Sequence, residues 1–321
     1  MTDTGRPTDV TLDHLLDAEL DVKPSPELVA RVRNRIAGET MRASWQVYGS
    51  ERRTTMGMMT RNGIKLAYDD RGAGDPTILF VHGWTCDRSF FAPQAEHFAG
   101  RHRVVSVDLR GHGESDKPNE PYPIEAYADD IAYLIEQLGL GKVVAVGHSM
   151  GGLTVAQLAA SHPHCVAAIA MVEPGPFAAP PEVRAVFEAI ANAIEAGNQE
   201  PRREFIRNNL FLPTSDPMFI EDVLRITMAA PSHVAAGALR GIARFDGLPV
   251  LGDCKVPALH LVAASPFNPP QLMSQWLPNV VHGQTVGAGH INQLEAPDQV
   301  NLMIDNFVRH YVLAPSAGGA A

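Results

Sequence analysis

The sequence predicts an α/β fold in which a mostly parallel eight-stranded sheet is flanked by helices. From residue 58 onward, strand-like and helical segments alternate, which is the order that builds a parallel sheet with helices on both faces. Some of the strand-like segments, such as residues 77–81, are continuous apolar runs, as strands buried on both faces require. A Gly-x-Ser-x-Gly turn at residues 147–151 then joins one apolar run to a helical pattern.

Composition excludes several functional classes. The chain has 321 residues, a net charge of -10 and a mean hydropathy of -0.06. Binding of nucleic acid needs a basic face, which this charge argues against. The N-terminus has no apolar signal region and no run of about 18 apolar residues occurs, so we expect a cytoplasmic protein without a membrane partner. The three cysteines are Cys86, Cys165 and Cys254. They are far apart and odd in number, so we expect no disulfide framework, no metal and no cofactor.

The two ends of the chain look different from the rest. Residues 1–57 predict an N-terminal helical extension followed by a linker, because leucines recur at helical spacing and Ser25-Pro26-Glu27 is a helix-start pattern. The apolar stripe is too narrow to form a core alone. The extension therefore packs on the main domain or serves as an arm for homo-oligomer formation. Residues 314–321 are small and of low complexity, which predicts a disordered tail.

Residues 58–176 and 252–313 form the predicted core. Asn62-Gly63 is a tight hairpin signal, so the core opens with an antiparallel pair of strands. The further expected strands are residues 77–81, 104–109, 143–146, 166–172, 258–262 and 280–286. The expected helices are residues 89–98, 124–138, 153–160 and 297–311.

Residues 177–251 interrupt this alternation, because no strand pattern occurs in them. Prolines divide the segment into four expected helices, at residues 182–196, 201–210, 217–229 and 232–245. A helical insertion between strands of this sheet predicts a cap over the carboxyl edge, where the turn at residues 147–151 also lies.

Ser149 is the central candidate residue. Gly147 and Gly151 flank it at two positions on either side, so the backbone turns sharply from a strand into a helix and leaves the hydroxyl exposed. A serine is a poor nucleophile at its ordinary pKa and needs a base to accept its proton.

Four motifs in order resemble the α/β-hydrolase superfamily. They are Phe-Val-His-Gly-Trp at 80–84, Asp-Leu-Arg-Gly-His-Gly-Glu-Ser at 108–115, Gly-His-Ser-Met-Gly-Gly at 147–152 and Gly-Ala-Gly-His at 287–290. The resemblance covers residues 58 to about 313. It implies that Ser149 is the nucleophile and His290 its base, and that the backbone N–H groups of Trp84 and Met150 form the oxyanion hole.

The acidic member of the triad departs from the commonest pattern of this superfamily. Most relatives carry an aspartate just after the strand that here ends near residue 262, but residues 263–268 read Ala-Ala-Ser-Pro-Phe-Asn. Some branches, including certain haloalkane dehalogenases, use the end of the strand after the nucleophile helix, where this chain has Glu173. We predict that Glu173 orients His290. Asn268 in a weakened triad and a purely structural Glu173 stay open as alternatives.

The predicted function is that of a serine hydrolase cleaving a carboxylic ester or lactone of a small to medium apolar substrate through an acyl-enzyme. Trp84, Phe90, Phe91 and Met150 are the predicted substrate-binding side chains, with ordinary core packing as the alternative for the two phenylalanines. Two other functions remain: hydrolysis of a carbon–carbon bond in a diketone-like substrate, and non-catalytic ligand binding on the same fold.

Overall fold

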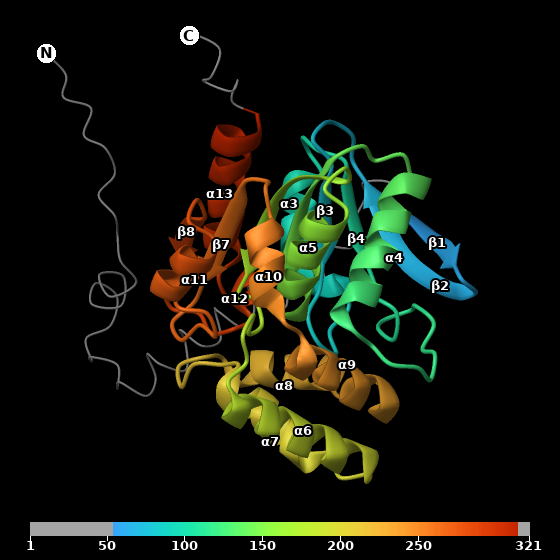
Figure 1. Cartoon of the computed structure of the whole chain (residues 1–321), viewed down its shortest axis with the longest axis vertical. Helices are drawn as coiled ribbons and strands as arrows, with labels where there is room; N and C mark the ends of the chain where they lie inside the picture. The colour runs from blue at the N-terminus through green and yellow to red at the C-terminus, as the bar shows by residue number, and fades with distance from the viewer. Residues whose placement is uncertain (1–53, 314–321) are drawn as a thin grey trace, which may run out of the picture. The chain divides into compact units, whose positions relative to one another are not determined.

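The structure is a computed structural model that describes residues 54–313 of the chain. The helical extension predicted within residues 1–53 and the tail predicted at 314–321 lie outside the described residues. In the described part, eight strands form one sheet in the order β1-β2-β4-β3-β5-β6-β7-β8 (Figure 1). This confirms the predicted fold class.

The sheet begins with the expected hairpin. β1 (Thr55–Arg61) pairs antiparallel with β2 (Ile64–Arg71), and the connecting Asn62 and Gly63 have φ angles of 51° and 83°. Two positive φ angles are what a tight two-residue hairpin turn requires. The predicted core boundary at residue 58 was late, because the pairing with β2 continues back to the first residue of β1.

The other strands make a parallel sheet beyond β2, which pairs antiparallel with β4. They are β3 (Ile78–Val81), β4 (Val104–Val107), β5 (Val143–His148), β6 (Val166–Val172), β7 (Ala258–Val262) and β8 (Val281–Gln284). Every residue of β3, β4, β5 and β7 is buried, which explains why these segments read as unbroken rather than alternating apolar runs.

Helices cover the sheet. The helices of the core are the short 3₁₀ helix η1 (Arg88–Phe91), α3 (Ala92–Phe98), α4 (Ile124–Gln137), α5 (Met150–Ser161) and α13 (Pro297–Phe307), with the π-helical turn η2 (Val308–Val312) at the end. A core cluster packs residues of α3 and α13 against the central strands, with Phe80 and Phe98 among its members. In Figure 1, α4 and α5 lie on the near side of the sheet.

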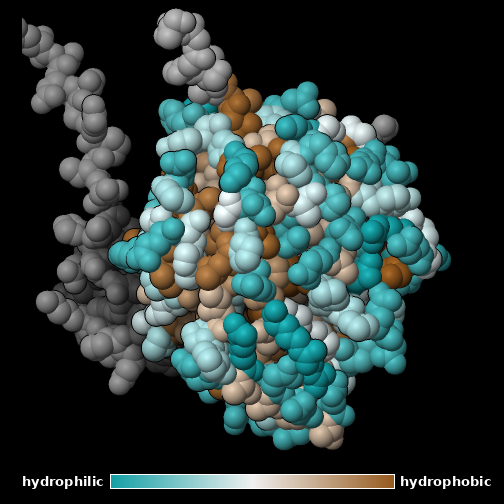
Figure 2. Space-filling model, viewed as in Figure 1, coloured by the Kyte–Doolittle hydropathy of each residue, from teal (hydrophilic) through white to brown (hydrophobic). Residues whose placement is uncertain are grey.

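Residues 173–257 contain helices and no strand. These helices are α6 (Pro181–Glu195), α7 (Glu200–Asn209), α8 (Pro217–Thr227), α9 (Ser232–Arg244) and α10 (Gly247–Asp253). The first four lie together below the sheet in Figure 1, and their outward side is mostly hydrophilic in Figure 2. The sequence reading missed α10, whose Gly247, Pro249 and Gly252 are typical of turns, and the short α11 (Pro270–Trp276) and α12 (Asn292–Glu295). None of the helices in the described part of the chain is both long and apolar enough to cross a membrane.

Candidate active site

Ser149 lies in a strained turn between β5 and α5. Its φ and ψ are 53° and -115°, a conformation that non-glycine residues rarely adopt. Crowding explains the flanking glycines: a Cβ on Gly147 would lie 2.1 Å from the Gly151 carbonyl oxygen, and one on Gly151 would lie 2.1 Å from the Val81 carbonyl oxygen. The Ser149 N–H donates to the Val172 carbonyl at 3.0 Å. The turn is therefore locked between β3 and β6.

Most of the strained non-glycine residues lie near this turn. Among the described residues other than glycine, only Asn62, Thr85, Ser149 and Glu173 have positive φ. Asn62 belongs to the first hairpin, whereas the other three follow the ends of β3, β5 and β6, which are adjacent in the sheet. Each such residue costs about 1–3 kcal/mol and persists only where its surroundings impose it. The strain makes this sheet edge a candidate functional site.

His290 and Glu173 meet at the same edge. His290 Nδ1 is 3.2 Å from Glu173 Oε2, and the two side chains are 7% and 1% exposed. The other carboxylate oxygen of Glu173 accepts from the Ala263 N–H, and the Glu173 N–H donates to the Leu261 carbonyl at 2.7 Å. The carboxylate is thus fixed at the end of β7, where it can hold the His290 ring with Nδ1 protonated and Nε2 free to accept a proton.

Asn268, the rival orienting residue, is engaged elsewhere. Its Oδ1 accepts from the Phe177 N–H at 3.1 Å, and its Nδ2 donates to the carbonyls of Pro174 and Gly175 at 2.9 Å. These bonds hold the chain just after Glu173, and among the described residues no hydrogen bond joins Asn268 to His290. The geometry therefore favours Glu173 as the partner of the histidine.

Two backbone N–H groups face no acceptor near Ser149. Met150 is the first residue of α5, so its N–H has no partner within the helix, and no described residue accepts a hydrogen bond from it or from the Trp84 N–H. A Cβ on Gly83 would lie 3.1 Å from the Ser149 Cβ, so the loop carrying Trp84 runs directly against the turn. These two unpaired N–H groups are therefore candidates for an oxyanion hole.

Two buried histidines brace this arrangement. His82 Nδ1 donates to the Gly83 carbonyl at 2.8 Å, and its Nε2 accepts from the Leu109 N–H at 3.1 Å. Burial lowers the pKa of His82, which keeps the ring neutral and both bonds intact. His148 Nε2 donates to the His290 carbonyl at 2.9 Å. Buried hydrogen bonds of these two histidines therefore connect the segments next to Ser149 to the neighbouring loops at Leu109 and His290.

Ser149 and His290 line one cavity of about 40 Å³, called here the catalytic cavity. Among the described residues, none is hydrogen-bonded to the Ser149 hydroxyl. The segment that holds α6–α9 contributes a mostly apolar part of the lining: Phe187, Ile206, Leu210, Thr227 and Ile242. Phe267 packs edge-on against the His290 ring at a centroid distance of 5.5 Å. The core thus supplies the reactive groups and the helices supply the apolar surface around them.

Of the four side chains predicted to bind substrate, Trp84 lines this cavity and the others do not. Phe90, Phe91 and Met150 are fully buried. Phe91 instead stacks on Phe80 at 4.8 Å within the core, because η1 turns it toward α3 and the sheet. The apolar character of these three residues predicts that they are buried, but it does not predict which surface they face. The same holds for the cavity-lining residues of the helices, because helical spacing identifies the apolar side of a helix and not the surface on which that side packs.

Trp84 also connects the core to the helices. Its indole Nε1 donates to the Ala235 carbonyl at 2.8 Å, and the Arg202 guanidinium carbon lies 5.7 Å from its ring centroid. Arg202 is 1% exposed and donates to the carbonyls of Thr227 and Ala230, with no carboxylate partner among the described residues. Burial lowers its pKa to about 10. This buried cation joins α7 to the end of α8 directly behind Trp84.

Comparison with known proteins agrees with this geometry. Residues 76–220 match the family model described as the alpha/beta hydrolase fold. The chain is 30% identical over 276 residues to 2-(acetamidomethylene)succinate hydrolase from Mesorhizobium japonicum, with 80% of this chain and 94% of that protein covered. It is 25% identical to 3-oxoadipate enol-lactonase 2 from Acinetobacter baylyi, with 79% and 96% covered.

A solved structure also resembles this chain over most of its length. A thermophilic esterase from Thermogutta terrifontis superposes with a TM-score of 0.72 and 28% sequence identity, covering 82% of this chain and all of that one. The shared part therefore extends well beyond the motif around Ser149.

Proposed function

Because the chain belongs to the α/β-hydrolase family, we propose that it is a serine hydrolase that cleaves a carboxylic ester or lactone through an acyl-enzyme. The observation that carries this proposal is that Ser149, held in a strained turn, shares a cavity with His290, whose Nδ1 lies 3.2 Å from the Glu173 carboxylate. Nucleophile, base and orienting acid thus come from three separate points of the chain to one sheet edge.

The reaction follows from this order of groups. Ser149 Oγ attacks the substrate carbonyl carbon while His290 Nε2 takes its proton, and Glu173 stabilises the resulting imidazolium. The carbonyl oxygen becomes an oxyanion that accepts from the N–H groups of Trp84 and Met150. Loss of one such donor typically costs about 10²–10³ in rate. His290 then protonates the departing alcohol oxygen, and a water activated by the same nitrogen releases the acid and restores Ser149.

The helices shape the substrate. We assign α6–α9 the role of a cap, because Phe187, Ile206 and Leu210 contribute apolar side chains to the lining of the catalytic cavity. A cavity of about 40 Å³ suits a short apolar acyl group. An esterase and an enol-lactonase among the similar proteins support ester and lactone bonds as targets.

A fluorophosphonate probe tests the nucleophile directly. The wild-type protein should be labelled on Ser149, and Ser149→Ala should not be. Turnover of p-nitrophenyl acetate and butyrate with an initial burst should accompany labelling, because acyl-enzyme formation precedes hydrolysis. Labelling without turnover of any ester or lactone would favour carbon–carbon bond hydrolysis. Failure of both labelling and turnover would favour a non-catalytic binding protein and overturn the proposal.

A further inference from the structure

Three possible metal ligands come together away from the active site. Glu136 near the end of α4, and His164 and Cys165 in the turn before β6, each offer one donor atom. These three atoms all lie within 4.8 Å of one another. In the part of the chain that the structure describes, no other three His, Cys, Asp or Glu side chains are placed in this way. We call these three residues the α4–β6 cluster.

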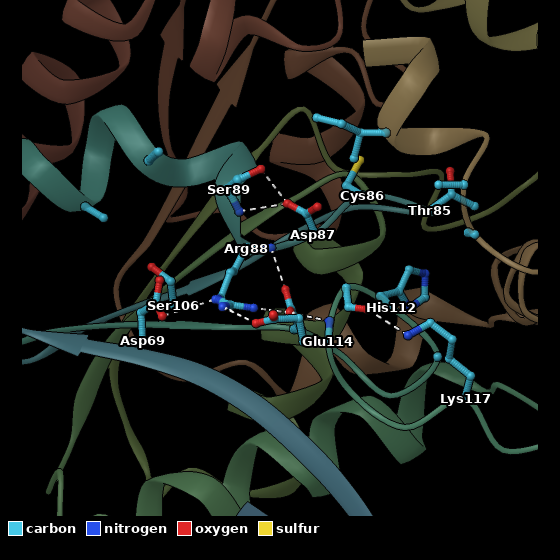
Figure 3. Close-up of a pocket in the computed structure, with 18 of the residues that line it drawn as sticks. Asp69, Thr85, Cys86, Asp87, Arg88, Ser89, Ser106, His112, Glu114 and Lys117 are labelled. Carbon is cyan, nitrogen blue, oxygen red and sulfur yellow. Dashed lines mark hydrogen bonds and ion pairs between the residues drawn. The ribbon is translucent and has the colours of Figure 1, made fainter. Parts of the chain in front are cut away.

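A cavity of about 580 Å³ also gathers charged side chains, but there a permanent cation lies among the carboxylates (Figure 3). Arg88, labelled in Figure 3, is paired with Asp108 and, at 2.6 Å, with Glu114. The carboxylate of Glu136 differs, because no Lys or Arg of the described residues pairs with it. Its ion-pair partner is His164 Nε2 at 3.0 Å, and a histidine is charged only when protonated. The α4–β6 cluster therefore lacks the permanent positive charge that the cavity has.

Two helix ends add negative charge beside the α4–β6 cluster. α4 ends at Gln137, directly after Glu136, and α5 ends at Ser161, shortly before His164 in the chain. The last turn of neither helix holds a basic residue. The unpaired carbonyl groups at a helix C-terminus carry partial negative charge, which stabilises a nearby cation. Both helix ends and the Glu136 carboxylate thus favour a cation at this place.

The donor atoms indicate which cation. Zinc is bound in proteins by Cys sulfur, His nitrogen and carboxylate oxygen, whereas magnesium and calcium take oxygen ligands. Around a tetrahedral zinc ion the donors would lie about 3.3–3.8 Å apart. From the observed limit of 4.8 Å, each pair therefore has to approach by at most about 1.5 Å. The side chains of Glu136 and His164 are 52% and 64% exposed, so both are free to rotate by this amount.

Cys165 is the fixed member of the α4–β6 cluster. Its N–H donates to the His162 carbonyl at 2.9 Å, and its carbonyl accepts from the Val143 N–H at 2.9 Å. Cys165 is 2% exposed, but the two side chains whose donor atoms lie nearest its sulfur are both more than half exposed. The sulfur therefore lies directly beneath the Glu136 and His164 side chains. An ion that enters between these two side chains reaches it.

We propose that Glu136, His164 and Cys165 bind one zinc ion, with water as the fourth ligand. The ion replaces the thiol proton of Cys165, which passes to solvent, so that sulfur binds as a thiolate. The expectation of no metal came from the spacing of the cysteines alone, whereas Glu136 reaches Cys165 only through the fold.

The zinc site is structural and independent of the proposed function. Ser149 precedes α5, and the α4–β6 cluster follows its other end, so the helix of 12 residues separates the two by about 18 Å. The ion joins the end of α4 to the start of β6. Zinc should therefore raise the Tm of the protein, because an ion that binds only the folded chain stabilises it.

Titration of the full chain with zinc chloride tests the site. The protein is purified without an affinity tag and stripped of metal, and calorimetry should show one zinc ion bound per chain. Cobalt chloride is the spectroscopic probe. Bound Co²⁺ should show a sulfur-to-metal charge-transfer band in the near ultraviolet, because one of the ligands is a thiolate. The Tm should rise with the zinc concentration.

Variants identify the ligands. Cys165→Ser should abolish the charge-transfer band and weaken zinc binding by about 100-fold. His164→Asn and Glu136→Gln change exposed side chains, so folding is not at risk, and each should weaken zinc binding by about tenfold or more. Cys254→Ser is the matched control, since Cys254 is also buried but lies outside the α4–β6 cluster, and it should retain both the band and the affinity.

Three results would overturn the inference. These are no zinc binding by the wild-type chain, cobalt binding without the charge-transfer band, and equal zinc affinity in the wild type, Cys165→Ser and His164→Asn. None of them bears on the serine hydrolase. Failure of the probe to label Ser149 while zinc still binds would remove only the proposed function.

Discussion

The strand ends that carry Ser149 and Glu173 and the helices α6–α9 that face them are held in different ways. Each strand-end residue is fixed by main-chain hydrogen bonds to the next strand, Ser149 to Val172 and Glu173 to Leu261. In the helices, Arg240 pairs with Glu188 at 3.0 Å and also with Glu195, at positions that are partly exposed. Main-chain hydrogen bonds of the sheet thus position the proposed catalytic groups. The helices that line the cavity are held together by side-chain ion pairs.

The two regions are nevertheless joined at the site. The His290 N–H donates to the Leu210 carbonyl at 2.9 Å, and the Trp84 indole donates to the Ala235 carbonyl at 2.8 Å. One bond links the proposed base to the end of α7, and the other links the oxyanion loop to α9. Substitutions at the strand ends should therefore act mainly on kcat, and substitutions in the helices mainly on stability and on substrate preference.

Glu173→Gln should have the largest effect. The amide can still accept from the Ala263 N–H, but its NH₂ group would face His290 Nδ1 and favour the wrong tautomer. We expect kcat for p-nitrophenyl butyrate to fall by about 10³–10⁴, with the urea midpoint close to that of the wild type. Near-normal turnover would remove Glu173 from the triad.

Asn268→Ala is the matched control for that experiment. It removes the bonds to Phe177, Pro174 and Gly175, so it should lower the free energy of unfolding by about 1–3 kcal/mol. The kcat should stay within about tenfold of the wild type, because Asn268 is not hydrogen-bonded to His290. A larger loss of kcat than in Glu173→Gln would reverse the assignment.

Arg202→Met should have the next largest effect, on stability. The substitution leaves the carbonyls of Thr227 and Ala230 buried without donors, which should lower the free energy of unfolding by about 2–3 kcal/mol in urea denaturation. Arg207→Met on the same helix is the control. Arg207 pairs with Glu221 on the surface, and such a pair contributes about 1 kcal/mol or less. Equal losses in the two variants would show that the buried cation does not hold the helices together.

The same contrast explains what the sequence could predict. Ser149 and Glu173 directly follow β5 and β6, and a buried strand reads as an apolar run that ends at a definite residue. A residue just after such a strand is thereby placed at the carboxyl edge. His290 lies beyond β8, which is not an apolar run, so its assignment came from the resemblance to the α/β-hydrolase superfamily. Phe187 lies in α6 and Leu210 directly follows α7, and the boundaries of both helices were also predicted closely. Their place in the cavity depends on how those helices pack, and helical spacing does not contain that information.

Phe90 and Phe91 show the opposite error. Closeness in sequence to the Trp84 loop suggested that they face the substrate, but η1 turns them into the core.

Phe187→Ala should change substrate preference by a smaller amount. Phe187 lines the catalytic cavity from α6, so its truncation makes room for a longer acyl chain. We expect the ratio of kcat/KM for p-nitrophenyl octanoate to that for the butyrate to rise about tenfold. Val186→Ala on the same helix is the control, since Val186 is 51% exposed and should leave the ratio unchanged. An unchanged ratio in Phe187→Ala would mean that α6 does not bound the acyl site.

The smallest expected effect is on the pH dependence of the free energy of unfolding. His260 is fully buried in β7, and burial lowers its pKa from 6.5 to about 3. The helices α6–α9 contain a single histidine, His233, between residues 181 and 244. Below pH 6.5 the unfolded chain binds a proton that folded His260 does not, so the free energy of unfolding falls as the pH decreases toward 3. Between pH 7 and pH 6 this loss is about 0.7 kcal/mol. Urea denaturation at both pH values should show a shallower pH dependence in His260→Leu than in the wild type. Identical slopes would mean that acid sensitivity does not arise from this histidine of the sheet.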